Sequence, residues 1–151
     1  KFKILLKEEK VEGSWISIKM TETAITTMNS IAERNLKMLK ELNVSIIVDD
    51  YGIGYGNIER IMALPVMQIN FAKSFLRMAG NSKRMMNVIS GLVNMFHDIS
   101  LFVCASGVDT PEDKDIAEEL GCDYLIGNYM CRPVSDNSYV DRIDEYFEKG
   151  Y

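Results

Sequence analysis

The chain has 151 residues, 47% of them hydrophobic, which is enough for the core of one ordinary domain. The net charge of -5 and the scattered lysines and arginines argue against nucleic acid as a partner. No apolar run approaches the ~20 residues that cross a bilayer, and the charged N-terminus is no signal peptide, so we expect no membrane segment and a cytoplasmic location.

Hydrophobic periodicity predicts helices and strands that alternate along the chain. Helical spacing predicts helices over 1–9, 26–42, 58–64, 71–79, 81–96, 111–120 and 139–149. Short apolar or alternating runs predict strands over 15–20, 44–48, 66–70, 101–105 and 122–126. The helix over 111–120 has the clearest start, because Thr110 is a favoured N-cap and Pro111 suits the first turn.

Five strand-helix units with short connections predict an α/β fold with a parallel sheet. No linker interrupts them, so residues 1–151 are expected to form a single domain. Two architectures stay open: an open doubly wound sheet, or part of a (β/α)8 barrel, which normally needs about 250 residues.

One stretch, 44–57, combines a buried-strand composition with two adjacent carboxylates, Asp49 and Asp50, and a glycine-punctuated loop. Ligand and metal sites gather at the carboxyl ends of parallel strands, so this pair is the first candidate site. The alternative is a helix N-cap, since Asp is a favoured capping residue.

The cysteine and histidine content excludes several other chemistries. Cys104, Cys122 and Cys131 contain no Cys-x-x-Cys pair and are expected to be small core residues in a reducing compartment. His97 is the single histidine and lies at the end of a predicted helix, where a positive charge suits the helix dipole. We therefore expect a structural role for it, without a histidine metal cluster or a catalytic triad.

Four ordered motifs resemble those of EAL domains, the phosphodiesterases and receptors of the bacterial messenger cyclic di-GMP. Segment 49–57 is similar to the family loop Asp-Asp-Phe-Gly-Thr-Gly-Tyr-Ser-Ser. Segment 64–70 resembles the family strand with Leu-Pro-Val and Lys-Ile-Asp, in shortened form, and segment 105–110 resembles Ala-Glu-Gly-Val-Glu-Thr. Segment 126–133 resembles the closing Gln-Gly-Tyr and Arg-Pro, and segment 19–22 lies where the family has Glu-x-Thr-Glu.

The resemblance implies the C-terminal part of an EAL-type TIM (β/α)8 barrel, so that residues 1–151 form a partial domain. The strand with the Glu-Ala-Leu signature and the strand with a metal-binding Asn are not in this chain. A half barrel would expose two sheet edges and the side chains that normally fill the barrel interior, and a stable protein must cover both. We expect the other half in a longer gene product, or a second copy of the chain.

Carried over position by position, the resemblance implies a degraded site. Asp49 and Asp50 match the ligand pair, Glu22 matches a glutamate that braces the glycine loop, and Tyr51, Gly52, Gly54 and Tyr55 belong to that loop. The substituted site positions are Lys19, Gln68, Asn70, Ser106, Asp109 and Ile126.

Active relatives bind two divalent cations, Mg²⁺ or Mn²⁺, through several carboxylates. Lys19 in place of a ligand glutamate changes the charge by two units, each worth about 4 kcal/mol at ~4 Å and an effective dielectric near 20. We therefore expect no metal cofactor and a salt bridge from Lys19 to Asp49 or Asp50. Lys19 contacting a phosphate in a metal-free pocket is the alternative.

The predicted function is a catalytically degenerate EAL-like domain, serving as a regulatory or interaction module in cyclic di-GMP signalling. A metal-free cyclic di-GMP receptor and an active metal-dependent phosphodiesterase are the alternatives. In the family, dimers commonly form near the glycine loop, so we also expect a protein partner or a homodimer through that face.

Overall fold

The computed structural model describes residues 2–53, 58–135 and 139. Its centre is a sheet of five strands: β1 (Ser17–Thr21), β2 (Ser45–Tyr51), β3 (Val66–Phe71), β4 (Phe102–Ser106) and β5 (Tyr124–Ile126). The strands lie in the order in which the chain forms them, and every neighbouring pair is parallel. A doubly wound sheet reverses its strand order at a switch point, whereas a barrel adds strands consecutively. The order therefore confirms the barrel type of α/β fold.

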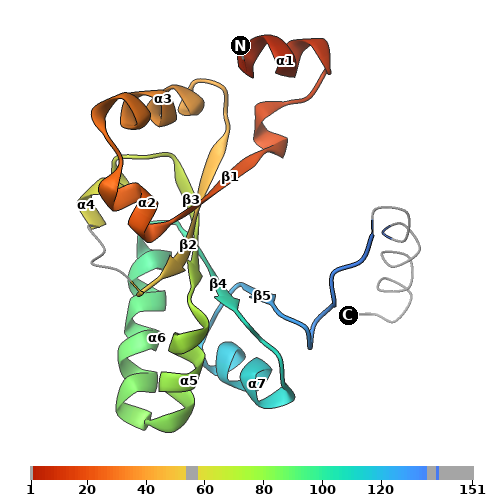
Figure 1. Cartoon of the computed structure of the whole chain (residues 1–151). Coiled ribbons are helices and arrows are strands. Elements are labelled where there is room, and N and C mark those ends of the chain that lie inside the picture. Colours follow the sequence, from red (N-terminus) through yellow and green to blue (C-terminus); the bar gives the residue numbers. More distant parts are fainter. Residues whose placement is uncertain (1, 54–57, 136–138, 140–151) are drawn as a thin grey trace.

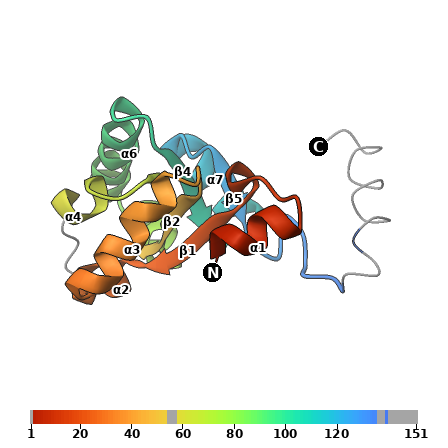
Figure 2. The same cartoon turned by 90° about the horizontal axis from the view of Figure 1, so that it is seen from above.

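The helices are α1 (Phe2–Glu8), α2 (Glu22–Thr27), α3 (Ser30–Lys40), α4 (Ile58–Met62), α5 (Lys73–Asn81), α6 (Lys83–Asp98) and α7 (Pro111–Leu120), with a 3-10 turn over Gly13–Trp15. Helices α2 to α7 pack on one face of the sheet, whereas α1 lies apart from this layer and buries none of its residues (Figures 1 and 2). Within the described ranges, none of the helices is long and apolar enough to span a membrane. The predicted helix over 139–149 lies outside the described residues, apart from Tyr139.

The core lies between the sheet and the helices. Alternate strand residues, Ile46, Val48, Ile69 and Val103, have no exposed surface and face the helix layer. Phe96 of α6 is equally buried. Strands buried in this way need the continuous apolar runs by which the sequence predicts them.

The predicted helix over 26–42 is wrong, because two helices occupy that range. Met28 is extended, with ψ 147°, and separates α2 from α3. Asn29 then caps α3, accepting a hydrogen bond from the Ala32 N–H at 2.9 Å. A local side-chain cap ended the helix where hydrophobic spacing alone predicts continuity.

Three predicted boundaries also move. β2 continues through Asp49 and Asp50 to Tyr51, so neither aspartate is a helix N-cap. Phe71 completes β3 and does not start a helix, and Trp15 lies in the 3-10 turn before β1. The extra length carries the Asp49 carboxylate to the carboxyl edge of the sheet.

The predicted start of α7 is confirmed. The Thr110 side chain accepts a hydrogen bond from the Asp113 N–H at 3.1 Å, and the Asp113 carboxylate accepts one from the Thr110 N–H at 3.1 Å. Pro111 occupies the first turn. This reciprocal capping box holds the loop after β4, which carries Asp109.

His97 and the cysteines have structural surroundings. His97 Nε2 lies 2.8 Å from Asp123 Oδ2, and the Val103 N–H donates to the same oxygen at 2.7 Å, joining α6 to β4 and the start of β5. All three cysteines are free. Burial raises the pKa of Cys104 to about 11 and that of Cys122 to about 12. Cys131 is exposed, so the prediction of a core residue is wrong for that cysteine.

Candidate functional site at the carboxyl edge of the sheet

The sheet brings four predicted site residues, from strands β1, β2 and β3, to its open face, opposite the helices. Lys19 pairs with Ile47 in the strand register, Ile47 with Gln68, and Asn70 with Cys104. Because side chains alternate along a strand, Lys19, Asp49, Gln68 and Asn70 share that face. Ligand sites of parallel sheets lie at this edge.

Four of these side chains form one polar chain, the Lys19–Gln68 network (Lys19, Asp49, Asn70 and Gln68). Lys19 Nζ lies 3.3 Å from Asp49 Oδ1, and Asn70 Nδ2 donates to the same oxygen at 3.0 Å. Gln68 Nε2 donates to Asn70 Oδ1 at 2.6 Å. Asn70 is fully buried, so its amide depends on these partners. The Asp49 carboxylate thus has its charge balanced by an ammonium from the same chain.

Glu22 connects β1 to the start of the glycine loop. It is 3% exposed at the first position of α2, and its Oε2 accepts a hydrogen bond from the Gly52 N–H at 2.8 Å. Gly52 has φ 97°, and a Cβ there would come within 1.9 Å of the Phe75 ring. This contact is what a loop brace requires, and only glycine fits the position without a shift.

The other predicted residues of the glycine loop and of the aspartate pair do not belong to the Lys19–Gln68 network. Tyr51 packs edge-on against Phe96, and burial, with the charge of Glu22 second, raises the pKa of its hydroxyl. Asp50 is exposed and has φ 55°. Gly54 and Tyr55 lie outside the described residues.

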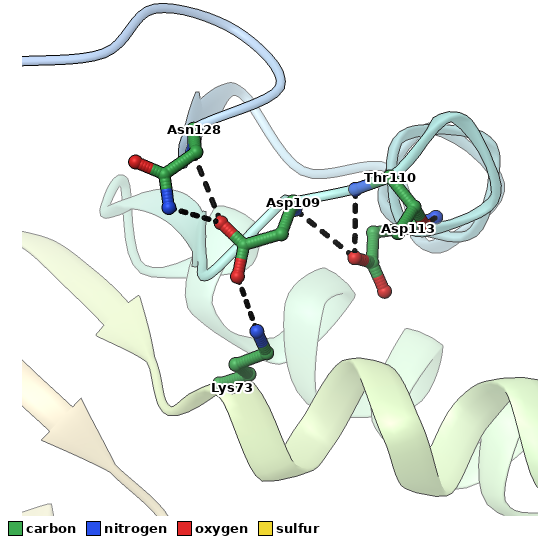
Figure 3. A network of polar contacts seen from close by, with 5 residues as sticks. All are labelled: Lys73, Asp109, Thr110, Asp113 and Asn128. Atoms are coloured by element: carbon green, nitrogen blue, oxygen red, sulfur yellow. Dashed lines mark hydrogen bonds and ion pairs between the residues drawn. The ribbon is translucent and has the colours of Figure 1, made fainter.

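Asp109 is the centre of a second cluster, the Asp109 cluster (Lys73, Asp109 and Asn128), shown in Figure 3. Its Oδ2 pairs with Lys73 Nζ at the start of α5. Its Oδ1 accepts from Asn128 N at 3.1 Å and from Asn128 Nδ2 at 3.0 Å. These hydrogen bonds, with that of Lys73 the largest cause, hold the pKa of Asp109 below its ordinary value. Both oxygens are therefore engaged in tying three loops together.

The last two predicted site positions, Ser106 and Ile126, lie at the ends of β4 and β5. They pair in the strand register, and Ile126 is 48% exposed. Neither side chain supplies a carboxylate. Cys104, on the same face as the Lys19–Gln68 network, is close enough for Lys19 to lower and Asp49 to raise its pKa, both less strongly than burial raises it.

The carboxylates at this edge are the groups that a divalent cation could use. Hard divalent ions need several oxygen ligands, usually carboxylates. Of the candidate positions at this edge, Asp49, Asp50 and Asp109 carry a carboxylate, and Asp49 and Asp109 are each paired with a lysine. Across residues 2–53 and 58–135, no group of three His, Cys, Asp or Glu side chains is placed to hold a metal ion.

Sequence reasoning missed Lys73 and Asn128 as partners of Asp109, and Cys104 as a neighbour of Lys19. Lys73 begins α5, a position that a helix dipole disfavours for a cation. This unfavourable position is a weak signal of a nearby anion, and it does not identify Asp109 as the partner. The side chains of Asn128 and Cys104 gave no such signal.

A family model and a curated relative both match this chain to the same family. The model of the EAL domain matches residues 1–133. Cyclic di-GMP phosphodiesterase RocR of Pseudomonas aeruginosa is 26% identical over 137 residues, which cover 91% of this chain and 35% of RocR.

Solved structures show the same fold. The EAL domain of Mycobacterium smegmatis DcpA superposes with a TM-score of 0.79 at 20% identity, over 93% of this chain and 63% of that chain. The EAL domain of FimX from Pseudomonas aeruginosa, bound to c-di-GMP, gives 0.77 at 18% identity, over 86% and 53%. The chain therefore spans less than two thirds of each of these relatives.

Proposed function

This chain belongs to the EAL domain family, and from that premise we propose that it is a catalytically degenerate member. In this proposal it acts in the cytoplasm as a regulatory or interaction module of cyclic di-GMP signalling. The observation that carries the proposal is the Lys19–Asp49 ion pair at 3.3 Å. An ammonium at this distance neutralises the negative charge of the Asp49 carboxylate, which a divalent cation would otherwise balance.

The electrostatic cost of placing a cation beside Asp49 supports a complete loss of metal-dependent catalysis and not a merely slower reaction. A cation that approaches Asp49 must displace or repel the Lys19 ammonium, and each unit charge at ~4 Å costs about 4 kcal/mol at an effective dielectric near 20. Asn70 uses the same Asp49 oxygen, so the carboxylate would also lose a hydrogen bond. Ser106 and Ile126 supply no replacement carboxylate.

The test is hydrolysis of cyclic di-GMP with Mg²⁺ or Mn²⁺, followed by chromatography of the linear dinucleotide product. We expect no turnover above the protein-free rate for the wild-type chain and for Asp49→Ala alike. Metal-dependent turnover that Asp49→Ala abolishes would overturn the proposal and support the active phosphodiesterase.

A metal-free receptor for cyclic di-GMP is the second candidate. It is favoured by the exposure of the Lys19 side chain, 49%, which leaves the ammonium accessible to a phosphate. Calorimetry in EDTA distinguishes the two. Binding that Lys19→Met weakens would favour the receptor, whereas no heat favours the interaction module.

The module also needs a partner surface. We place it at the face around the glycine loop, where Ile53 and Ile58 are 69% and 40% exposed on the two sides of the loop. A homodimer through that face should dissociate in an Ile58→Glu variant, measured by light scattering. A wild-type chain that stays monomeric at ~100 µM would rule this homodimer out.

A further inference from the structure

Helix α6 carries two stripes of side chains. Its buried residues, Ile89, Val93 and Phe96, face the core. On the opposite side of the helix, residues at alternating spacings of four and three form an exposed row, the α6 stripe (Arg84, Val88, Gly91, Met95 and Asp98). Val88 is 50% exposed and Met95 is 38% exposed. This spacing keeps a row of residues on one side over several turns, so that a second helix can pack along it.

Gly91 lies at the midpoint of the α6 stripe, seven residues from each end, or about 10 Å along the helix axis. Glycine is less favourable than alanine in the middle of a helix. Within the described part of the chain, and apart from the backbone of α6 itself, no atom lies within 4 Å of the place where its Cβ would stand. The packing of this chain therefore does not require a glycine here. The missing side chain does allow the backbone of a neighbouring helix to approach closely.

The two ends of the α6 stripe carry charges that their own helix disfavours. Arg84 lies in the first turn, at the positive end of the helix dipole, and Asp98 is the last residue, at the negative end. Among the residues that the structure describes, neither side chain forms an ion pair. Each charge alone is a weak signal of a partner. Together they are opposite in sign and lie at equal distances from Gly91.

A second α6 helix that runs antiparallel, about a twofold axis at Gly91, suits all of these features. Arg84 of each copy then lies beside Asp98 of the other, and each charge meets the favourable end of the other helix's dipole. Val88 of one copy lies within one residue's rise of Met95 of the other. A parallel pair in register would instead bring like charges together. Both the identity of the partner and its direction therefore follow from the stripe.

We propose that the α6 stripe is a self-association surface, through which two copies of this chain pack their α6 helices antiparallel about Gly91. A twofold contact uses the same patch on both copies, so the patch must be complementary to itself, as the α6 stripe is in charge and shape. Its residues differ from Ile53 and Ile58 of the glycine-loop face. The inference does not depend on whether the domain binds or hydrolyses nucleotide.

The test is charge reversal in the 151-residue chain, with dimerisation measured by sedimentation equilibrium. We expect a wild-type dimer at ~100 µM. Arg84→Asp and Asp98→Arg each place like charges at both ends of the contact, so each variant alone should dimerise about tenfold or more weakly. A mixture of the two variants restores opposite charges at both ends. It should therefore form a heterodimer as tight as the wild-type dimer.

Asp115→Arg is the matched control. Like Asp98→Arg, it reverses an exposed aspartate of a helix, but it lies on α7 and should dimerise as wild type. Thermal melting of each variant at low concentration checks its folding. Recovery in the mixture is a second check, because two misfolded chains would not restore each other's contact.

The same measurements can overturn the proposal. A wild-type chain that is monomeric at ~100 µM would exclude this surface. Single variants that dimerise as wild type, or a mixture no tighter than either variant alone, would show that Arg84 and Asp98 do not face each other. A dimer that Ile58→Glu dissociates, and that both α6 variants leave intact, would place the interface at the glycine-loop face and refute the α6 contact.

Discussion

Replacement of Lys19 by glutamate tests the charge balance at the candidate site. At the 3.3 Å separation of Lys19 Nζ and Asp49 Oδ1, the Coulomb energy is about 1.3 kcal/mol in water and about 5 kcal/mol at a dielectric near 20. The two side chains are 49% and 25% exposed, which places the pair near the watery limit, at about 1 kcal/mol. Lys19→Glu turns this attraction into repulsion, so we expect a loss of about 2 kcal/mol.

The assay is thermal unfolding, in which ~2 kcal/mol corresponds to about 6 °C for a chain of this size. The loss should shrink in 0.5 M salt, because screening shortens the range of charge interactions. Lys37→Glu is the matched control, since Lys37 pairs with Glu33 at 2.8 Å on the surface of α3. This i,i+4 pair is worth about 0.5 kcal/mol, so its reversal in Lys37→Glu should cost about 1 kcal/mol, half the loss expected for Lys19→Glu.

Metal ions provide the second part of the test. Lys19→Glu places a second carboxylate beside Asp49, and ~10 mM Mn²⁺ acting on a site of ~1 mM affinity would restore about 1.4 kcal/mol. The wild-type chain should gain nothing comparable. Equal stabilisation of both proteins by Mn²⁺, or a Lys19→Glu chain as stable as wild type, would refute the charge-balance reasoning.

Three further variants test the surrounding structure. Gly52→Ala should destabilise by about 2 kcal/mol, measured by urea unfolding, because of its positive φ and the Phe75 ring at 1.9 Å from the added carbon. Gly91→Ala, in α6 with no atom within 4 Å, should stabilise by about 1 kcal/mol; two equal changes would contradict this contrast. Because the Lys73 hydrogen bond lowers the pKa of Asp109, its contribution is present above the unfolded-state pKa near 3.9 and is lost as pH falls through the lower folded pKa. The stability difference between wild type and Asp109→Asn should therefore shrink from pH 6 to pH 2, and a constant difference would contradict the role of the ion pair.

Local patterns in the sequence predicted most of the fold. Buried strands such as β2 and β4 follow from apolar runs, and the limits of α7 follow from Thr110 and Pro111 at its start. The break at Met28 was missed because the hydrophobic spacing continues through it. The family resemblance, confirmed by the EAL model over 1–133, supplied the barrel that periodicity alone left undecided.

The site was only partly predictable, because its contacts join residues far apart in the chain. The resemblance singled out Lys19 and Asp49, and a salt bridge from Lys19 was expected with either aspartate. The choice of Asp49 depends on the pleat, which turns it and Lys19 to one face and leaves Asp50 outside the network. The pairing of Lys73 with Asp109 depends on how α5 and α7 start beside each other, which no local pattern encodes.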